Sequence, residues 1–557
     1  MIARKTAWRG LSGMGFARAL ASLAIADFLT LVALNLLQCA VAWTPLVFVL
    51  ACAASYALMR RVRWRREERT SDPWPWVFAA IACVLLALPR VPYVLEWLPG
   101  NTVGSVMDDY ARIPEVASMV LSPRYPLQHP ANPEYLLSFY YTALYPMAAL
   151  KLLVPWLTIK DCIFAGNLIV HALALGSLVG IAQLLVRDRG KVRLLVFLVT
   201  VFGGLDWLMK TPWRWLGHSE WWQGRFMGNT QISSFYTSML WAVHHFSGFM
   251  ALLLAWLVLV HARAGGRRTK SLIVLLLLAA AFYSSPFAVM SVPLFALALP
   301  RVVWRRLVAT PAFPVVIALA LVPLYLFLGK PSTIGFTVSG FRVPFTGHLW
   351  ADKALSLPIY LTLVPLVEFG GAPFLVLAWW RRLSPAERAY FVAAATFFLL
   401  TYVVAFIGAN DFCMRGMMLP TFVFFALFAR HAEPLLQPRP GAALRALRTS
   451  LATIAVLGAL GTTKEWATLT FAGLYRSTLF WDLRHRTDLP PGLARLRELN
   501  ARAIARDRRI TRVPYAEVAT LGYDMYSLEK LVDRKPLVQM ERGEIELLRY
   551  PRHGFLR

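Results

Sequence analysis

Long apolar runs separated by short polar segments occupy most of the chain up to residue 465. A helix that crosses a bilayer needs about 20 predominantly apolar residues, because it rises only 1.5 Å per residue through the hydrocarbon core. The pattern therefore predicts an all-α polytopic membrane protein with about 13 transmembrane helices. The expected spans are residues 19–42, 45–59, 74–95, 162–186, 192–208, 236–260, 271–283, 286–300, 307–328, 355–380, 389–408, 417–430 and 449–465.

Residues 134–158 are also apolar enough to cross, but they contain Pro146, Pro155 and several Tyr and Trp side chains. Such residues suit the headgroup boundary of a membrane. We expect this stretch to form juxtamembrane helices within a first outer loop at residues 96–161. The alternative, a further crossing, would move two basic segments to the outer side.

The pattern changes after residue 465. Residues 466–557 are dense in charge, and the alternation in KPLVQMERGEIELLRY indicates strands and a hairpin. We therefore expect a multi-pass transmembrane domain at residues 1–465, followed by a small α+β extracytoplasmic domain at residues 466–557.

The composition supports a membrane protein. Hydrophobic residues make up 58% of the chain and charged residues 16%, whereas soluble domains have roughly 45–50% and about 25%. This excludes a disordered chain and a soluble nucleic-acid-binding protein, although the net charge of +28 alone would suit the latter. The lipid bilayer is thus an expected partner, and nucleic acid is not.

The basic residues also predict the orientation. Seven short segments (1–18, 60–69, 187–193, 261–270, 301–306, 381–388 and 430–448) together hold 28 Lys and Arg residues. The intervening segments 96–133, 208–235, 329–353 and 409–416 hold 9. Because loops rich in Lys and Arg stay in the cytoplasm, the first set is expected inside, with the N-terminus. Thirteen crossings then place the C-terminal domain outside.

Two adjacent carboxylates, Asp108 and Asp109, occupy the first outer loop. A carboxylate at the mouth of a membrane cavity is suited to act as a general base or as a metal ligand. Alternatively, Asp109 caps the N-terminus of a short helix, which is an equally good reading of the pair alone.

Other polar residues lie near the outer face. Arg225 and Arg342 belong to the second and third outer loops, where guanidinium groups are suited to bind phosphate. The neighbours His244 and His245 start the helix after the second loop, and either cavity lining or ordinary helix packing explains them.

Glu368 lies inside an apolar span, where a charge is expensive and usually faces a cavity. Its alternative role is that of a protonated or paired packing residue. Asn410, Asp411 and Arg415 form a polar island between two spans. Asp411 and Arg415 are four residues apart, so they either pair with each other or Arg415 binds an anion in the cavity.

This order of features resembles the C-type (GT-C) superfamily of membrane glycosyltransferases, which use polyprenyl-phosphate-linked sugars. The acidic pair lies near the start of the first large outer loop and is followed by a Pro- and Tyr-rich juxtamembrane segment. One span then runs inward to a basic turn, and a short second span runs back outward. The resemblance covers residues 74–430 in outline and is one of architecture. The segments that carry it are Asn132-Pro133-Glu134-Tyr135, Tyr140-Tyr141, RDRGKVR and VFLVTVFGGLDW.

The resemblance implies an inverting glycosyltransferase on the periplasmic face of a bacterial inner membrane, in cell-envelope glycan or glycolipid synthesis. Carried over from the family, Asp109 or Asp108 is the base that deprotonates the acceptor hydroxyl, with Asp109 favoured. The departing lipid phosphate needs a cation, a role for Arg415, Arg225 or Arg342. Some family members also use a divalent cation such as Mg²⁺ or Mn²⁺, and no second acidic cluster here decides this.

No Trp-Trp-Asp motif of oligosaccharyltransferases is present, which argues against N-glycan transfer. The sugar and the acceptor (a lipid, a glycan or a protein) stay open. A membrane transporter or flippase for lipid-linked substrates is the main alternative, with Glu368 and the interrupted spans as its path. A non-catalytic partner in envelope assembly is a further alternative.

Overall fold

The structure is a computed structural model that describes most of the transmembrane part of the chain. The described residues are 13–62, 72–90, 116, 119–120, 122–125, 127–129, 132–136, 141–157, 159–186, 188–209, 232, 234–241, 243–261, 267–283, 290–299, 336–338, 345–406, 411–437 and 441–485.

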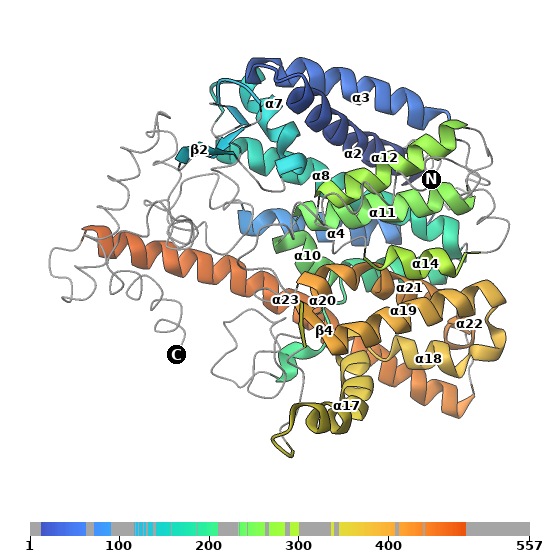
Figure 1. The fold of residues 1–557 in the computed structure, drawn as a ribbon. Helices are drawn as coiled ribbons and strands as arrows, with labels where there is room; N and C mark the ends of the chain where they lie inside the picture. Colours follow the sequence, from blue (N-terminus) through green and yellow to red (C-terminus); the bar gives the residue numbers. More distant parts are fainter. Residues whose placement is uncertain are drawn as a thin grey trace, which may run out of the picture.

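Helices dominate these residues (Figure 1). The first half contains α2 (Gly13–Leu36), α3 (Thr44–Arg60), α4 (Trp74–Ala87), α7 (Tyr145–Leu153), α8 (Ile159–Val186), α9 (Arg189–Thr200), α10 (Phe235–Trp241), α11 (Val243–His261) and α12 (Arg267–Tyr283). The second half contains α14 (Val292–Leu297), α17 (Leu349–Phe369), α18 (Ala372–Ala378), α19 (Pro385–Val403), α20 (Asp411–Gly416), α21 (Met418–His431), α22 (Glu433–Leu436) and α23 (Ala442–His485).

Within the described residues, six helices are long and apolar enough to cross a membrane, or seven if one bent pair counts as a span. The architecture is that of a multi-pass α-helical membrane protein, as expected, whereas the number of thirteen spans stays a prediction. The six are Gly13–Leu36, Val41–Arg60, Asp161–Val186, Val243–Val260, Cys413–His431 and Ala442–Lys464.

The helices pack in two groups joined by α21. In the first group α2 contacts α3, α8, α11 and α12, and in the second α21 contacts α18 and α19 (Figure 1). Helix α21 also contacts α8, α9 and α11, so it links the groups. The backbones of α2 and α8 meet at Gly13 and Gly180, where an added Cβ on Gly13 would lie 2.4 Å from the Gly180 Cα. Only glycine permits this approach.

Two predicted spans each correspond to a pair of helices. The expected helix at 236–260 corresponds to α10 and α11, and residue 242 between them lies outside the described residues. The expected helix at 355–380 begins earlier, at Leu349, and bends by 108° between α17 and α18. The bend is made by Gly370 and Gly371, which both have a positive φ, a conformation that favours glycine.

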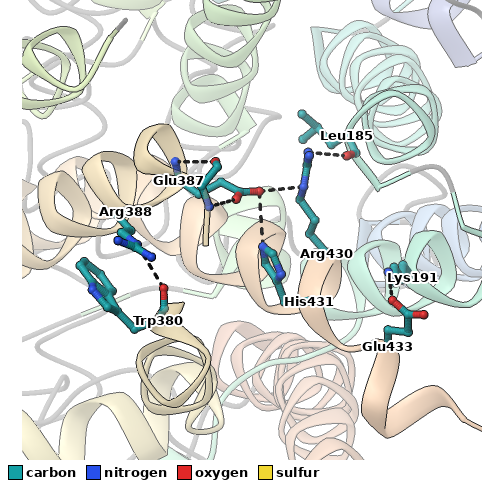
Figure 2. Close-up of polar contacts among 9 residues, drawn as sticks. Leu185, Lys191, Trp380, Glu387, Arg388, Arg430, His431 and Glu433 are labelled. Atoms are coloured by element: carbon teal, nitrogen blue, oxygen red, sulfur yellow. Dashed lines mark hydrogen bonds and ion pairs between the residues drawn. The ribbon is translucent and has the colours of Figure 1, made fainter. Parts of the chain in front are cut away.

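Ion pairs gather where α19 begins and α21 ends, a part of the bundle that we call the basic end (Figure 2). Glu387, in the first turn of α19, accepts from the Ser384 N–H in a capping box. Its Oε1 lies 2.7 Å from Arg430 Nε and 3.4 Å from His431 Nε2. Burial raises the pKa of Glu387, but the hydrogen bonds from His431 and Ser384 and the charge of Arg430 lower it more, to about 2.

A second ion pair at the basic end joins α4 to α9. Arg193 donates to both carboxylate oxygens of buried Asp72, at 2.7 and 2.9 Å. Burial raises the pKa of Asp72, and the hydrogen bonds from Arg193 and the Trp74 N–H, with the charge of Arg189, outweigh it and hold the pKa below its usual range. Arg430 also donates to the carbonyl of Leu185, so the C-terminus of α8 lies here too.

The opposite end, which we call the far end, carries the part of the predicted first outer loop that the structure describes. A short antiparallel hairpin, β1 (Gln128–His129) and β2 (Asn132–Leu136), precedes the 3₁₀ turn Tyr141–Leu144 and α7. Buried Tyr125 is anchored on the α2–α3 connection: its N–H donates to the Cys39 carbonyl and its hydroxyl lies 3.1 Å from Thr44 Oγ1. Residues 141–153 form this turn and a nine-residue helix against α3 and α8.

Helix α23 extends beyond the predicted domain boundary at residue 465, to His485. In Figure 1 it runs from beside α22 toward the side of the molecule where β2 lies. Only 6% of its Ala442–Lys464 window is buried, which leaves an apolar surface suited to lipid contact. Residues 486–557, the rest of the predicted C-terminal domain, lie outside the described residues.

Candidate functional site

Half of the predicted site residues fall outside the part of the chain that the structure describes. These are Asp108, Asp109, Arg225, Arg342 and Asn410. The catalytic assignment therefore stays a prediction. Along the chain, the described residues nearest to the acidic pair on its N-terminal side belong to η3 (Leu88–Arg90), at the end of α4.

The short helix α20 (Asp411–Gly416) begins at Asp411. Arg415 is its last residue but one and is half-buried. The helix follows β4 (Val404–Phe406), which pairs in antiparallel register with β3 (Phe336–Val338). Helix α20 contacts β4 and α21. Asp411 and Arg415 thus lie between β4, which follows α19, and α21, at the end of α19 opposite Glu387.

Glu368 is buried near the C-terminus of α17, two residues before the bend. Three chain segments meet beside it. The Leu205 N–H donates to the Val367 carbonyl at 2.7 Å, and the Gly203 N–H donates to the Gly458 carbonyl of α23 at 3.1 Å. Glu368 therefore lies where the end of α9, the bend after α17 and the middle of α23 come together.

Sequence reasoning missed Asp27, which lies in the middle of α2 inside the first predicted span. It is 1% exposed, and its Oδ2 accepts a hydrogen bond from the Tyr283 hydroxyl of α12. The signal that singled out Glu368, an ionisable residue within an apolar run, applies equally to Asp27.

A small pocket surrounds Asp27. His244 of α11, Asn167 of α8 and Tyr283 line it together with Asp27, and a role of His244 toward a substrate stays a prediction. His245 is buried beside it, with its ring centroid 3.8 Å from that of His244. The remaining lining residues are Ala143, Leu144, Met147, Ile163, Val170, Val243 and Ser247.

The pocket lies in the half of the bundle that includes the far end. Asn167 is eight residues from the start of α8, or about 12 Å at 1.5 Å per residue. Tyr283 ends α12 and His244 is the second residue of α11. Residues 143, 144 and 147 of the pocket belong to the turn and helix within the predicted first outer loop. The juxtamembrane segment therefore forms one wall of the pocket.

Lys353 is a second buried charge whose position differs from the sequence-based expectation. Residues 329–353 were predicted to form an outer loop, but Asp352 and Lys353 are buried near the start of α17. Lys353 Nζ donates to the Tyr402 carbonyl at 2.7 Å and lies 4.3 Å from the Tyr402 ring centroid. The Tyr402 hydroxyl donates to the Lys353 carbonyl. These reciprocal contacts hold α17 against the C-terminus of α19.

No group of three or more His, Cys, Asp and Glu side chains suited to a metal ion occurs among the described residues. The Mg²⁺ or Mn²⁺ requirement implied by the family resemblance is therefore still an expectation about the outer loops.

Comparisons of the chain with protein-family models, with curated proteins and with solved structures give no match.

Proposed function

We propose that the protein is an integral membrane glycosyltransferase of the GT-C kind, which moves a sugar from a polyprenyl-phosphate donor to an acceptor hydroxyl. The observation that supports this best is the pocket around Asp27, which α7 helps to line near the far end of the bundle. The segment that leads into α7 carries Asp108 and Asp109. In the proposed orientation this end faces the periplasm of a bacterial cell, where envelope glycans and glycolipids are assembled.

The proposed reaction is a single displacement. Asp109 or Asp108 takes the proton of the acceptor hydroxyl while the hydroxyl oxygen forms a bond to the anomeric carbon of the sugar. The bond from that carbon to the phosphate oxygen breaks, its electron pair stays on the phosphate, and the configuration inverts. Arg415, at the end of α20, stabilises the departing phosphate, because a guanidinium donates two parallel hydrogen bonds to such oxygens.

The test is sugar transfer by the purified protein in lipid vesicles, with radiolabelled polyprenyl-phosphate-linked pentoses and hexoses and a membrane lipid extract as acceptor. Asp108→Asn and Asp109→Asn are measured separately. Loss of the base lowers the transfer rate by about 10²–10⁴-fold in one of them. Thr421→Val, a buried α21 variant away from the pocket, keeps the wild-type rate. Full transfer in both Asn variants would contradict the assignment.

A transporter or flippase for lipid-linked substrates is the second candidate. It is favoured by the bent pair α17–α18, because broken helices often form substrate sites in transporters. Movement of the labelled lipid across the vesicle membrane, without any glycosylated product, would support this candidate over the transferase.

A further inference from the structure

Two buried polar atoms in the Asp27 pocket have no hydrogen-bond partner among the described residues. They are Asp27 Oδ1, an acceptor, and Asn167 Nδ2, a donor. Both side chains line the pocket, and they are 1% and 3% exposed. Buried polar groups are normally hydrogen-bonded, so an unmatched acceptor and an unmatched donor in one pocket indicate a bound polar group.

The chemistry of the two atoms selects the class of that group. A hydroxyl donates one hydrogen bond and accepts others, so it satisfies Asp27 Oδ1 and Asn167 Nδ2 together. A metal cation would satisfy the carboxylate but would be repelled by the amide N–H. The second Asp27 oxygen is held by the Tyr283 hydroxyl, which fixes the carboxyl group.

The rest of the pocket suits a ligand with an apolar part. Ala143, Leu144 and Met147 of the juxtamembrane segment, with three branched aliphatic side chains (Ile163, Val170 and Val243), form its other walls. The Ser247 hydroxyl is already bonded to the Val243 carbonyl. The pocket has a volume of about 20 Å³, which accommodates one hydroxyl group of a sugar and not its whole ring, whereas a phosphate is larger and would meet the Asp27 carboxyl group unfavourably.

We propose that this pocket is a subsite that binds one hydroxyl group of the sugar on the polyprenyl-phosphate donor, with Asp27 as acceptor and Asn167 as donor. The proposal rests on the proposed function. It assigns recognition of the sugar to the transmembrane helices α2 and α8, beneath α7, and leaves the chemical step to the outer loops.

The test compares the binding of two lipids to the full-length protein in detergent. One is polyprenyl phosphate, and the other is the same lipid carrying glucose, mannose or arabinose. Affinity is obtained from the rise of the melting temperature with lipid concentration, since a ligand of the folded state stabilises it. The wild type binds at least one sugar-bearing lipid about tenfold or more tightly than the bare lipid, the value of one good hydrogen bond.

Asp27→Asn and Asn167→Leu both abolish this preference. In Asp27→Asn, the remaining oxygen keeps Tyr283, so an N–H group faces the hydroxyl in place of an acceptor. In Asn167→Leu, the leucine side chain has a volume similar to that of asparagine but no hydrogen-bond donor. If Asp27→Asn does not fold, this variant alone tests the proposal. Thr421→Val, whose buried hydroxyl does not line the pocket, keeps the preference.

The outcomes separate the two proposals. If both pocket variants keep the preference, or if the wild type binds the bare and sugar-bearing lipids equally, the subsite is wrong, whatever the transfer assay shows. If the preference depends on Asp27 and Asn167 but the wild type transfers no sugar, the subsite stands and the transferase is wrong.

Discussion

At the scale of single residues, Tyr283 is the side chain that positions Asp27. Its hydroxyl is the donor to Asp27 Oδ2, and both residues are buried between α2 and α12. Tyr283→Phe removes this donor and leaves a buried carboxyl oxygen unmatched. We expect the free energy of unfolding to fall by about 1–3 kcal/mol.

This loss is measured by denaturant unfolding in bicelles. Tyr56→Phe is the matched control, because Tyr56 is 52% exposed on α3 and its hydroxyl removal leaves the stability unchanged. Equal stability of Tyr283→Phe and the wild type would show that the Asp27 contact contributes nothing.

Glu387 gives a pH-dependent prediction. Its pKa is lowered from 4.5 to about 2 in the folded state, so it binds fewer protons there than in the unfolded chain. Its contribution to stability is therefore complete above the unfolded pKa and is lost as the pH falls from about 4.5 toward 2. The melting temperature of the wild type should decrease over this range.

In Glu387→Gln this part of the decrease should be missing, because the amide does not titrate, and the protein should melt lower at neutral pH. Glu433→Gln, which changes a 77% exposed carboxylate 3.6 Å from Lys191, should keep the wild-type pH profile. Parallel pH profiles for the wild type and Glu387→Gln would refute the role of this ion pair.

Asp27 and Lys353 show what residue-level reasoning could reach. An ionisable residue within an apolar run can be identified from the sequence alone. This criterion identifies Glu368, and it holds equally for Asp27. The burial of Lys353 could not be predicted, because it depends on the carbonyl of Tyr402, which is 49 residues away along the chain. A tertiary partner of this kind leaves no local pattern.

At the scale of elements, Gly370 fixes the bend between α17 and α18. Its φ is +58°, and an added Cβ would lie 3.1 Å from Ile454 and Phe202. Gly370→Ala should lower the free energy of unfolding by about 1–2 kcal/mol, the cost of a left-handed conformation for an L-residue. Gly441→Ala, with nothing within 4 Å of the added Cβ, should have no such effect when both are measured in the same bicelle assay. An equal effect of the two substitutions would contradict the proposed strain.

The helices that the apolar runs predict well are those without internal breaks, such as α3 and α8. The start of α17 was placed six residues too late, because Asp352 and Lys353 interrupt the hydropathy while lying inside the helix. Hydropathy thus locates a span better than it locates its ends or bends.

At the scale of the whole molecule, the basic end and the far end should lie on opposite sides of the membrane. In a variant without the five native cysteines, Trp156→Cys places a thiol on an 81% exposed position after α7. Glu433→Cys places one at the basic end. A membrane-impermeant maleimide added to intact spheroplasts should label the first and reach the second only after permeabilisation. The reverse labelling would invert the orientation.

The overall architecture followed from composition and hydropathy, because a membrane imposes apolar helices of a narrow range of lengths. The nine-residue α7 agrees with the expectation of a short helix in the Pro- and Tyr-rich residues 134–158, and its juxtamembrane position stays a prediction. The Asp27 pocket could not be predicted from the sequence, because it joins residues of α2, α8, α11 and α12 whose contact depends on how the helices pack.

The stereochemistry of sugar transfer tests the central claim most directly. The purified protein is incubated with a polyprenyl-phosphate-linked sugar of known anomeric configuration, and the configuration of the glycosylated product is determined by NMR. An inverting transferase gives a product of opposite configuration, formed at a rate that depends on Asp108 or Asp109. A product of retained configuration, or no product while the labelled lipid crosses the membrane, would contradict the account.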